Sequence, residues 1–148
     1  MKKKILSSLK PVNEREIIEA VLDEALRTTN KVRQNDRLQF ALYCLIHYPR
    51  GMMETTIIDA LRGVLQKDRG TSQMIFSLGL KELLEKGPRD IQENLVSLLY
   101  DCVFADRQRF RQLFTVDPGF LVRIKTRNQS FEIQRMLDLI RDLSNMPQ

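Results

Sequence analysis

Apolar side chains recur at helical spacing along almost the entire chain, and no alternating, strand-like pattern lasts long enough to compete. The first helix is predicted to begin at Asn13, whose side chain can form a capping box with Glu16 three positions later. The second helix is predicted to be capped by Asn35 or Asp36 and to stop at the Pro-Arg-Gly break at 49–51.

Further helices follow the same apolar pattern towards the end of the chain. A third helix is predicted over about 52–66, and a fourth, capped by Thr71 or Ser72, ends at Gly87. Pro88 suits the first turn of the next helix, because the N–H that proline lacks would have no partner there. The sequence therefore predicts an all-α chain.

The predicted helices also recur in pairs. The pair Ile17-Ile18 returns as Ile57-Ile58, a shift of 40 residues, and the apolar positions of 38–46 return in 76–84. A period near 40 is typical of HEAT and armadillo arrays, in which pairs of helices stack on their neighbours. A generic antiparallel bundle would give a similar match of apolar positions, so it remains the alternative for this half of the chain.

The C-terminal part of the chain repeats its interruptions as well as its apolar positions. Long amphipathic helices are predicted from Ile91 and from Phe131. Between them lie a short basic helix, the break Pro118-Gly119, a short apolar helix and the polar gap 125–130. In this order of elements, the segment 90–145 resembles an armadillo repeat.

The resemblance implies both an architecture and a docking surface. The expected fold is all-α, a short armadillo/HEAT-like α-α superhelix of paired antiparallel helices over 13–148, after a basic flexible tail at 1–12. In armadillo repeats the long third helix lines a groove, where an asparagine holds the backbone of an extended peptide. The matching positions here are Asp101 and Asp142, which we predict to face a partner. The predicted groove is lined by the helices 36–47, 72–85, 91–104 and 131–143.

Most of the net charge of the chain, which is +5, lies in one segment. The segment 105–127 holds six basic and two acidic residues. Its field would attract an acidic segment of a protein partner or nucleic-acid phosphates, whereas a solvated face needs no partner at all. Nucleic acid is the weaker alternative, because tryptophan is absent and the nearby phenylalanines have core spacing. The predicted partner-binding cations are Arg107, Arg109, Arg111, Arg123, Lys125 and Arg127.

Few residues of the sequence could support catalysis. His47 is the single histidine and, near a predicted helix end, is better interpreted as a capping residue than as a general base. Cys44 and Cys102 lie within apolar helical patterns and are predicted to be buried. Histidine-based zinc and di-iron sites are excluded, and no P-loop or dinucleotide-binding motif is present. We therefore predict neither an enzyme nor a cofactor.

The expected location is the cytosol or the nucleus, because no apolar run reaches the length of a membrane span or of a signal peptide. The predicted function is a non-enzymatic protein-protein interaction adaptor, or a subunit of a larger assembly, which docks partners on its helical-repeat surface. Self-association into a homo-oligomer would cover apolar surface at the ends of such a stack. The alternative function is a nucleic-acid-binding helical protein that uses the segment 105–127.

Overall fold

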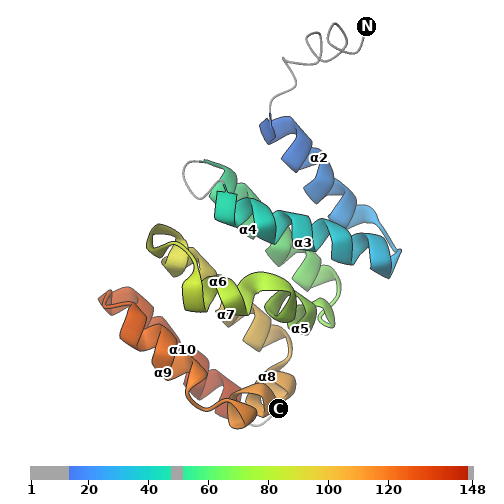
Figure 1. Ribbon diagram of the computed structural model, residues 1–148. Helices are drawn as coiled ribbons and strands as arrows, with labels where there is room; N and C mark the ends of the chain where they lie inside the picture. Colours follow the sequence, from blue (N-terminus) through green and yellow to red (C-terminus); the bar gives the residue numbers. More distant parts are fainter. Residues whose placement is uncertain (1–13, 48–51, 147–148) are drawn as a thin grey trace, which may run out of the picture.

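The computed structural model describes residues 14–47 and 52–146, and every regular element within these ranges is helical (Figure 1). The prediction of an all-α fold is confirmed. The predicted tail at 1–12 and the predicted cap Asn13 lie outside the described residues. In chain order, the elements are α2 (Glu14–Arg27), α3 (Lys31–His47), α4 (Met52–Lys67), α5 (Thr71–Ile75), the π-helical turn η1 (Phe76–Leu80), α6 (Lys81–Lys86), the 3-10 turn η2 (Arg89–Ile91), α7 (Gln92–Ala105), α8 (Arg107–Val116), α9 (Phe120–Arg127) and α10 (Phe131–Asn145).

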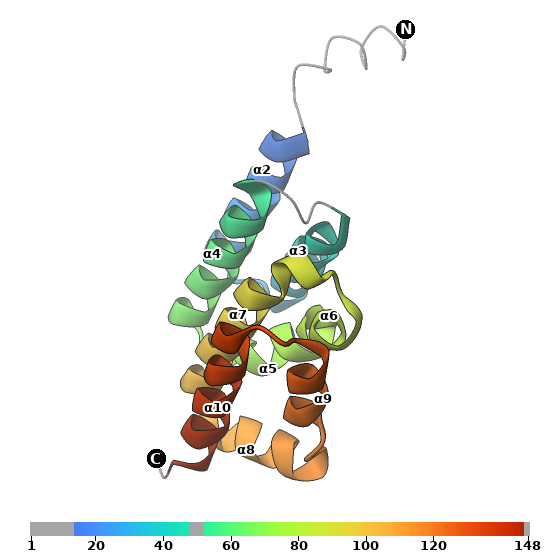
Figure 2. The same ribbon diagram turned by 90° about the vertical axis from the view of Figure 1, so that its left-hand side faces the viewer.

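The helices pack in two rows. In the first row, α2 packs on α4, α4 on α7, and α7 on α10; in the second row, α3 packs on η1 and α6 packs on α9 (Figure 2). The short helix α8 contacts α7 and α10 at the far end of the stack. The 40-residue recurrence joins α2 to α4 in the first row, and the recurrence of 38–46 in 76–84 joins α3 to α5–η1–α6 in the second. The recurrence therefore marks which helices share a row.

Four helices were predicted to line one groove, but they do not lie in one row, so that prediction is wrong. The helices 91–104 and 131–143 lie in the first row, whereas 36–47 and 72–85 lie in the second. The reason is the extra helix α8, which the C-terminal unit has and the N-terminal pairs lack. Because of it, the helix equivalent to α3 and α6 is α9 rather than α10.

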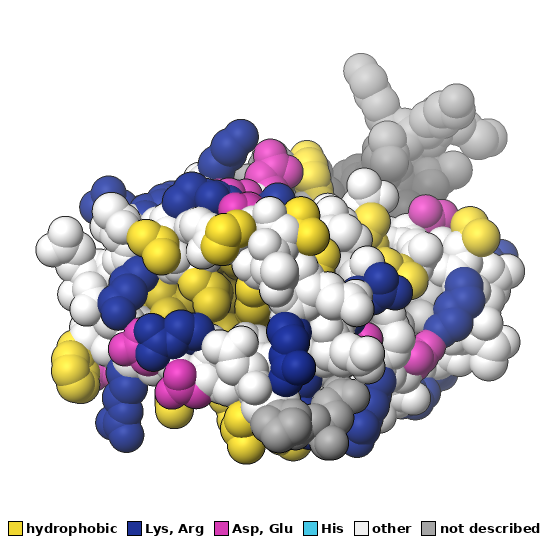
Figure 3. All heavy atoms as spheres, turned by 90° about the horizontal axis from the view of Figure 1, so that it is seen from below, with side chains coloured by type: hydrophobic (Ala, Val, Ile, Leu, Met, Phe, Trp, Pro, Cys, Tyr) yellow, Lys and Arg dark blue, Asp and Glu magenta, His cyan; other side chains and the backbone are white. Residues whose placement is uncertain are grey.

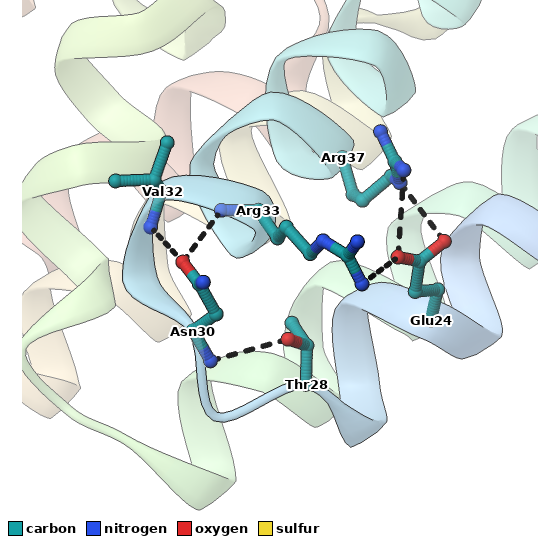
Figure 4. A network of polar contacts seen from close by, with 6 residues as sticks. All are labelled: Glu24, Thr28, Asn30, Val32, Arg33 and Arg37. Carbon is teal, nitrogen blue, oxygen red and sulfur yellow. Dashed lines mark hydrogen bonds and ion pairs between the residues drawn. The ribbon is translucent and has the colours of Figure 1, made fainter.

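The start of α3 differs from its prediction, because another residue caps this helix. The side-chain oxygen Oδ1 of Asn30 accepts hydrogen bonds from the backbone N–H groups of Val32, at 3.0 Å, and Arg33, at 3.2 Å (Figure 4). This is the bonding of a helix N-cap. Asn35 and Asp36, the predicted caps, lie inside α3, so that prediction is wrong.

Side-chain contacts tie α3 to α2. The carboxylate of Glu24 on α2 lies 3.1 Å from Nε of Arg37 and 3.8 Å from a guanidinium nitrogen of Arg33, both on α3 (Figure 4). The loop 28–30 between the two helices is short, which places them side by side as an antiparallel pair.

The predicted cap of the fourth helix, Thr71 or Ser72, is also wrong. The residue before α5 is Gly70, and no side chain caps this helix. Thr71 is the first residue of α5, and its hydroxyl donates to the carbonyl oxygen of Asp68 at 2.7 Å. The predicted end of this helical segment at Gly87 is confirmed.

One core of buried aliphatic and aromatic side chains joins the two rows. The ring centroid of Phe76 on η1 lies 5.2 Å from that of Phe110 on α8 and 5.4 Å from that of Phe120 on α9, both edge-to-face. Such pairs contribute about 0.5–1.5 kcal/mol beyond their buried area. These rings thus anchor η1 to the C-terminal helices. By contrast, Ile17 on α2 is 50% exposed beside the buried Ile18.

Candidate functional site

Two of the six predicted cations cap the ends of other helices. The guanidinium of Arg111 on α8 donates to the carbonyl oxygen of Ser144 at 2.9 Å and to that of Met146 at 2.7 Å, at the end of α10. The guanidinium of Arg127 donates to carbonyl oxygens at the end of α6, including that of Gly87. The last carbonyl groups of a helix lack intrahelical partners and form the negative end of its dipole. Both arginines therefore stabilise the fold.

Two further cations, both on α9, form ion pairs within the protein. A guanidinium nitrogen of Arg123 lies 2.7 Å from a carboxylate oxygen of Asp117 and 2.9 Å from one of Glu85 on α6. The hydrogen bond from Arg123 holds the pKa of Asp117 below its usual value. Nζ of Lys125 lies 3.1 Å from a carboxylate oxygen of Asp138 on α10. These pairs join α9 to its neighbours and partly neutralise the basic segment.

The two remaining cations, Arg107 and Arg109, lie in the first turn of α8. Arg109 is exposed and Arg107 is half-buried. Neither side chain forms an ion pair or a hydrogen bond with another residue in the described part of the chain. Of the six cations expected to bind a partner, these two are the ones that have no such contact within the described ranges.

The carboxylates expected to face a partner, Asp101 and Asp142, both lie in the first row, on α7 and α10. Nε of Arg62 on α4 lies 2.5 Å from a carboxylate oxygen of Asp101. This ion pair borders a recess of about 380 Å³ between α4 and α7, which the exposed Phe104 also lines. Asp142 is 67% exposed and lies 3.4 Å from the adjacent Arg141. Asp101 thus links two helices, whereas Asp142 is open to solvent.

A larger and more apolar groove opens on the second row, between α3 and the segment η1–α6. Its volume of about 560 Å³ lies within the range of about 300–1,000 Å³ that is usual for binding pockets. Leu42 and Leu83 contribute buried apolar side chains, and Tyr43 is 55% exposed beside them. We call this the second-row groove; its lining residues are Gln39, Leu42, Tyr43, Leu78, Gly79, Glu82, Leu83, Lys86, Gly87 and Pro88.

The π-helical turn shapes the second-row groove. Both Leu78 and Gly79 come from η1. A Cβ atom on Gly79 would lie 3.3 Å from two side-chain atoms of Leu42, so the absence of a side chain lets η1 approach α3 closely. Single π-helical turns within α-helices are frequent at functional sites. The groove therefore combines a close helix approach with a locally altered helix.

Charges of opposite sign border the second-row groove. Glu82 and Lys86 lie one turn apart on α6, and both are exposed. No ion pair joins either side chain to another residue that the structure describes. The groove can therefore accept apolar side chains of a partner while the rim pairs with charges of both signs.

One feature of the sequence, Gly79, could have indicated the second-row groove but was not recognised. Gly79 interrupts an otherwise apolar helical stretch, and an isolated glycine in such a pattern often has a packing or functional reason. The π-helical turn itself could not be recognised from periodicity, because it displaces the apolar positions by only one residue. The sequence therefore did not predict the groove.

Reactive groups are sparse in the described ranges. Burial raises the pKa of both thiols, those of Cys44 and Cys102, and both cysteines are buried as predicted. Within the described residues, 14–47 and 52–146, no group of three or more histidine, cysteine or acidic residues could hold a metal ion. Among the described helices, none has the length and apolar character needed to cross a membrane.

Comparison of the chain with protein-family models, with curated proteins and with solved structures gives no match. The resemblance of 90–145 to an armadillo repeat therefore stays a prediction that rests on the order of its helices and breaks.

Proposed function

We propose that this chain is a non-enzymatic protein-interaction module with an armadillo/HEAT-like arrangement of helices. It would act as an adaptor or as a subunit of a larger assembly in the cytosol or nucleus. Three features support the proposal: the packing of helices in two rows, the recurrence of apolar positions within each row, and the helix order of 90–145. Stacked helices of this kind present extended surfaces for other macromolecules.

The second-row groove is the observation that carries the proposal, and its occupant is an amphipathic helix of a protein partner. The groove lies between α3 and η1–α6, and helices commonly insert a row of apolar side chains into a groove of this kind. Glu82 and Lys86 are about 5–6 Å apart along α6, the rise of one turn. The partner helix accordingly carries a basic residue facing Glu82 and an acidic residue facing Lys86, one turn apart.

The basic segment contributes to this function through its two unengaged cations. Arg107 and Arg109 remain able to attract an acidic segment of the partner, whereas the other four cations are held by contacts within the fold. For the same reason the nucleic-acid alternative is less well supported: phosphate binding depends on several free cations acting together.

Selection from a displayed library of amphipathic helical peptides tests the proposal directly. We expect the selected peptides to share apolar positions at i, i+3 or i+4 and i+7, with charges matching Glu82 and Lys86. Tyr43→Glu should weaken their binding by at least about tenfold, because it places a carboxylate in the apolar groove.

Val32→Glu is the matched control for this test. Val32 also lies on α3 and is 70% exposed, but it does not line the groove. Its replacement should leave peptide binding within about twofold of the wild type. Equal loss of binding in both variants, or selected peptides without an apolar face, would overturn the proposal.

A further inference from the structure

The helix α10 exposes a stripe of side chains that no other described helix covers. Phe131 is 73% exposed, and Leu139 and Met146 are each 50% exposed. Arg135 and Asp142 lie between them and are also exposed. At 3.6 residues per turn, the four positions on α10 fall within about 80° of the helix surface, and Met146 directly follows the last residue of the helix. They lie opposite the face of α10 that is buried in the core.

The neighbouring helix α9 also exposes an apolar side chain. Figure 3 shows the end of the stack with hydrophobic side chains gathered in a hollow over α9 and α10, bordered by charged side chains. Val122 on α9 is 62% exposed. Contiguous exposed apolar surface with a polar border typically marks a contact site for another protein.

The order of residues along the stripe is self-complementary. Arg135 and Asp142 lie at equal distances on either side of the point between Asp138 and Leu139, and so do Phe131 and Met146. A twofold axis through that point would pack two copies of α10 antiparallel. Each Arg135 would then face Asp142 of the second copy, and each Phe131 would face Met146. In a twofold interface, every contact of this kind occurs twice.

The charges of the stripe are free to form these contacts. The side chain of Arg135 forms no ion pair or hydrogen bond with another residue in the described ranges. Asp142 contacts the adjacent Arg141 at 3.4 Å, and both side chains are more than half exposed. In the antiparallel arrangement Glu132 falls opposite the neutral Asn145, and Asp138, which lies next to the axis, is paired at 3.1 Å with Lys125 of its own copy.

We propose that α10 is the interface of a homodimer, in which the stripe of one copy packs antiparallel on the same stripe of a second copy. None of the residues that line the second-row groove lies on α10, so the dimer leaves two grooves open. Two grooves in one particle would bind a partner with repeated helical segments more tightly than one groove does. The homodimer does not depend on the proposed function, because its interface stands on different residues.

Sedimentation of charge-reversed variants tests both the dimer and its register. The wild type should change from monomer to dimer as the protein concentration rises from about 1 to 500 μM. Arg135→Asp alone sets two carboxylates against each other in each pair, and Asp142→Arg alone sets two guanidinium groups against each other. Each variant should therefore raise the dissociation constant at least about tenfold at low salt. An equimolar mixture of the two variants should form a heterodimer, because one variant then carries carboxylates at both positions and the other carries guanidinium groups at both, so both pairs have opposite charges.

The double variant Arg135→Asp/Asp142→Arg completes the test of register. It restores opposite charges in both pairs of the antiparallel arrangement, so it should dimerise within about threefold of the wild type. Arg89→Asp provides the control for charge reversal, because Arg89 is exposed and lies on η2, outside the stripe. It should dimerise as the wild type does.

Three results would overturn the proposal. The first is a wild type that stays monomeric at about 500 μM. The second is a pair of single variants that dimerise normally. The third is a double variant that stays monomeric, because the antiparallel register is part of the claim.

Discussion

Arg62 and Asp101 form an ion pair that joins two successive helices of the first row. Nε of Arg62 on α4 lies 2.5 Å from a carboxylate oxygen of Asp101 on α7, and the same guanidinium donates to the hydroxyl of Ser97. Asp101 stands where the armadillo resemblance would place a peptide-binding asparagine. In this chain the position instead serves a contact between helices.

A double-mutant cycle should measure this contact. Both side chains are about one-third exposed, so we expect a coupling free energy of about 0.5–1 kcal/mol between Arg62→Ala and Asp101→Ala. The coupling should shrink in about 0.5 M salt, because the pair is partly screened. Asp101→Asn should destabilise the protein less than Asp101→Ala, since the amide oxygen can still accept a hydrogen bond. A coupling near zero at low salt would show that the two side chains act independently in solution.

Arg111 and Arg109 should respond differently to the same substitution. Arg111→Ala removes two hydrogen bonds to the end of α10 and should lower the free energy of unfolding by about 1–2 kcal/mol. Arg109→Ala, on the same helix, should change it by no more than about 0.5 kcal/mol. Urea denaturation of the two variants and the wild type measures both values. Equal effects would contradict the division of the basic segment into structural and unengaged cations.

For the basic segment, the sequence predicts where the cations lie along the chain but not which groups they contact. The concentration of six cations in 105–127 is evident from the sequence alone. Whether a cation faces solvent or a helix end could not be predicted, because Arg111 and Arg127 reach carbonyl groups that lie 33 to 43 residues away in sequence. Tertiary packing alone decides which helix end comes within their reach.

Gly87→Ala should destabilise the protein, because a Cβ atom there would lie 2.4 Å from the carbonyl oxygen of Leu83. The obstacle is backbone, which cannot move aside as the end of a flexible side chain can. We expect a loss of about 1–3 kcal/mol, measured by thermal or urea unfolding. The comparison is Gly70→Ala, where the nearest atom is a carboxylate oxygen of Asp68 at 3.1 Å. A variant at Gly87 as stable as the one at Gly70 would contradict the close packing of this turn.

Both cysteines should resist thiol reagents in the folded protein. Burial raises the pKa of the Cys102 thiol and, in the same direction, that of Cys44, so little thiolate forms and the reagent cannot reach it. We expect no reaction with an aromatic disulfide reagent at about pH 8 on a timescale of minutes, and full reaction of both in denaturant. Rapid labelling of the native protein would show that α3 or α7 opens readily.

The fold was more predictable than the candidate site. Apolar spacing identified the helices, and its recurrence placed α2 with α4 and α3 with α5–η1–α6. It could not reveal that Asn30 rather than Asn35 caps α3, because both residues are good caps and the choice depends on the turn before the helix. The second-row groove depends on how closely Gly79 approaches Leu42, a distance between helices that no local pattern encodes.

The central claim is that partners dock in the second-row groove, and site-specific photo-cross-linking tests it most directly. A photoreactive side chain is placed at the exposed groove residue Gln39 or, as a control, at Val32 on the same helix. In cells that express the chain, we expect cross-links from position 39 to an amphipathic helical segment of a partner, identified by mass spectrometry. Tyr43→Glu should remove these cross-links, and position 32 should give none to that segment. Cross-links that survive Tyr43→Glu, or that are the same from both positions, would show that partners do not dock in the second-row groove.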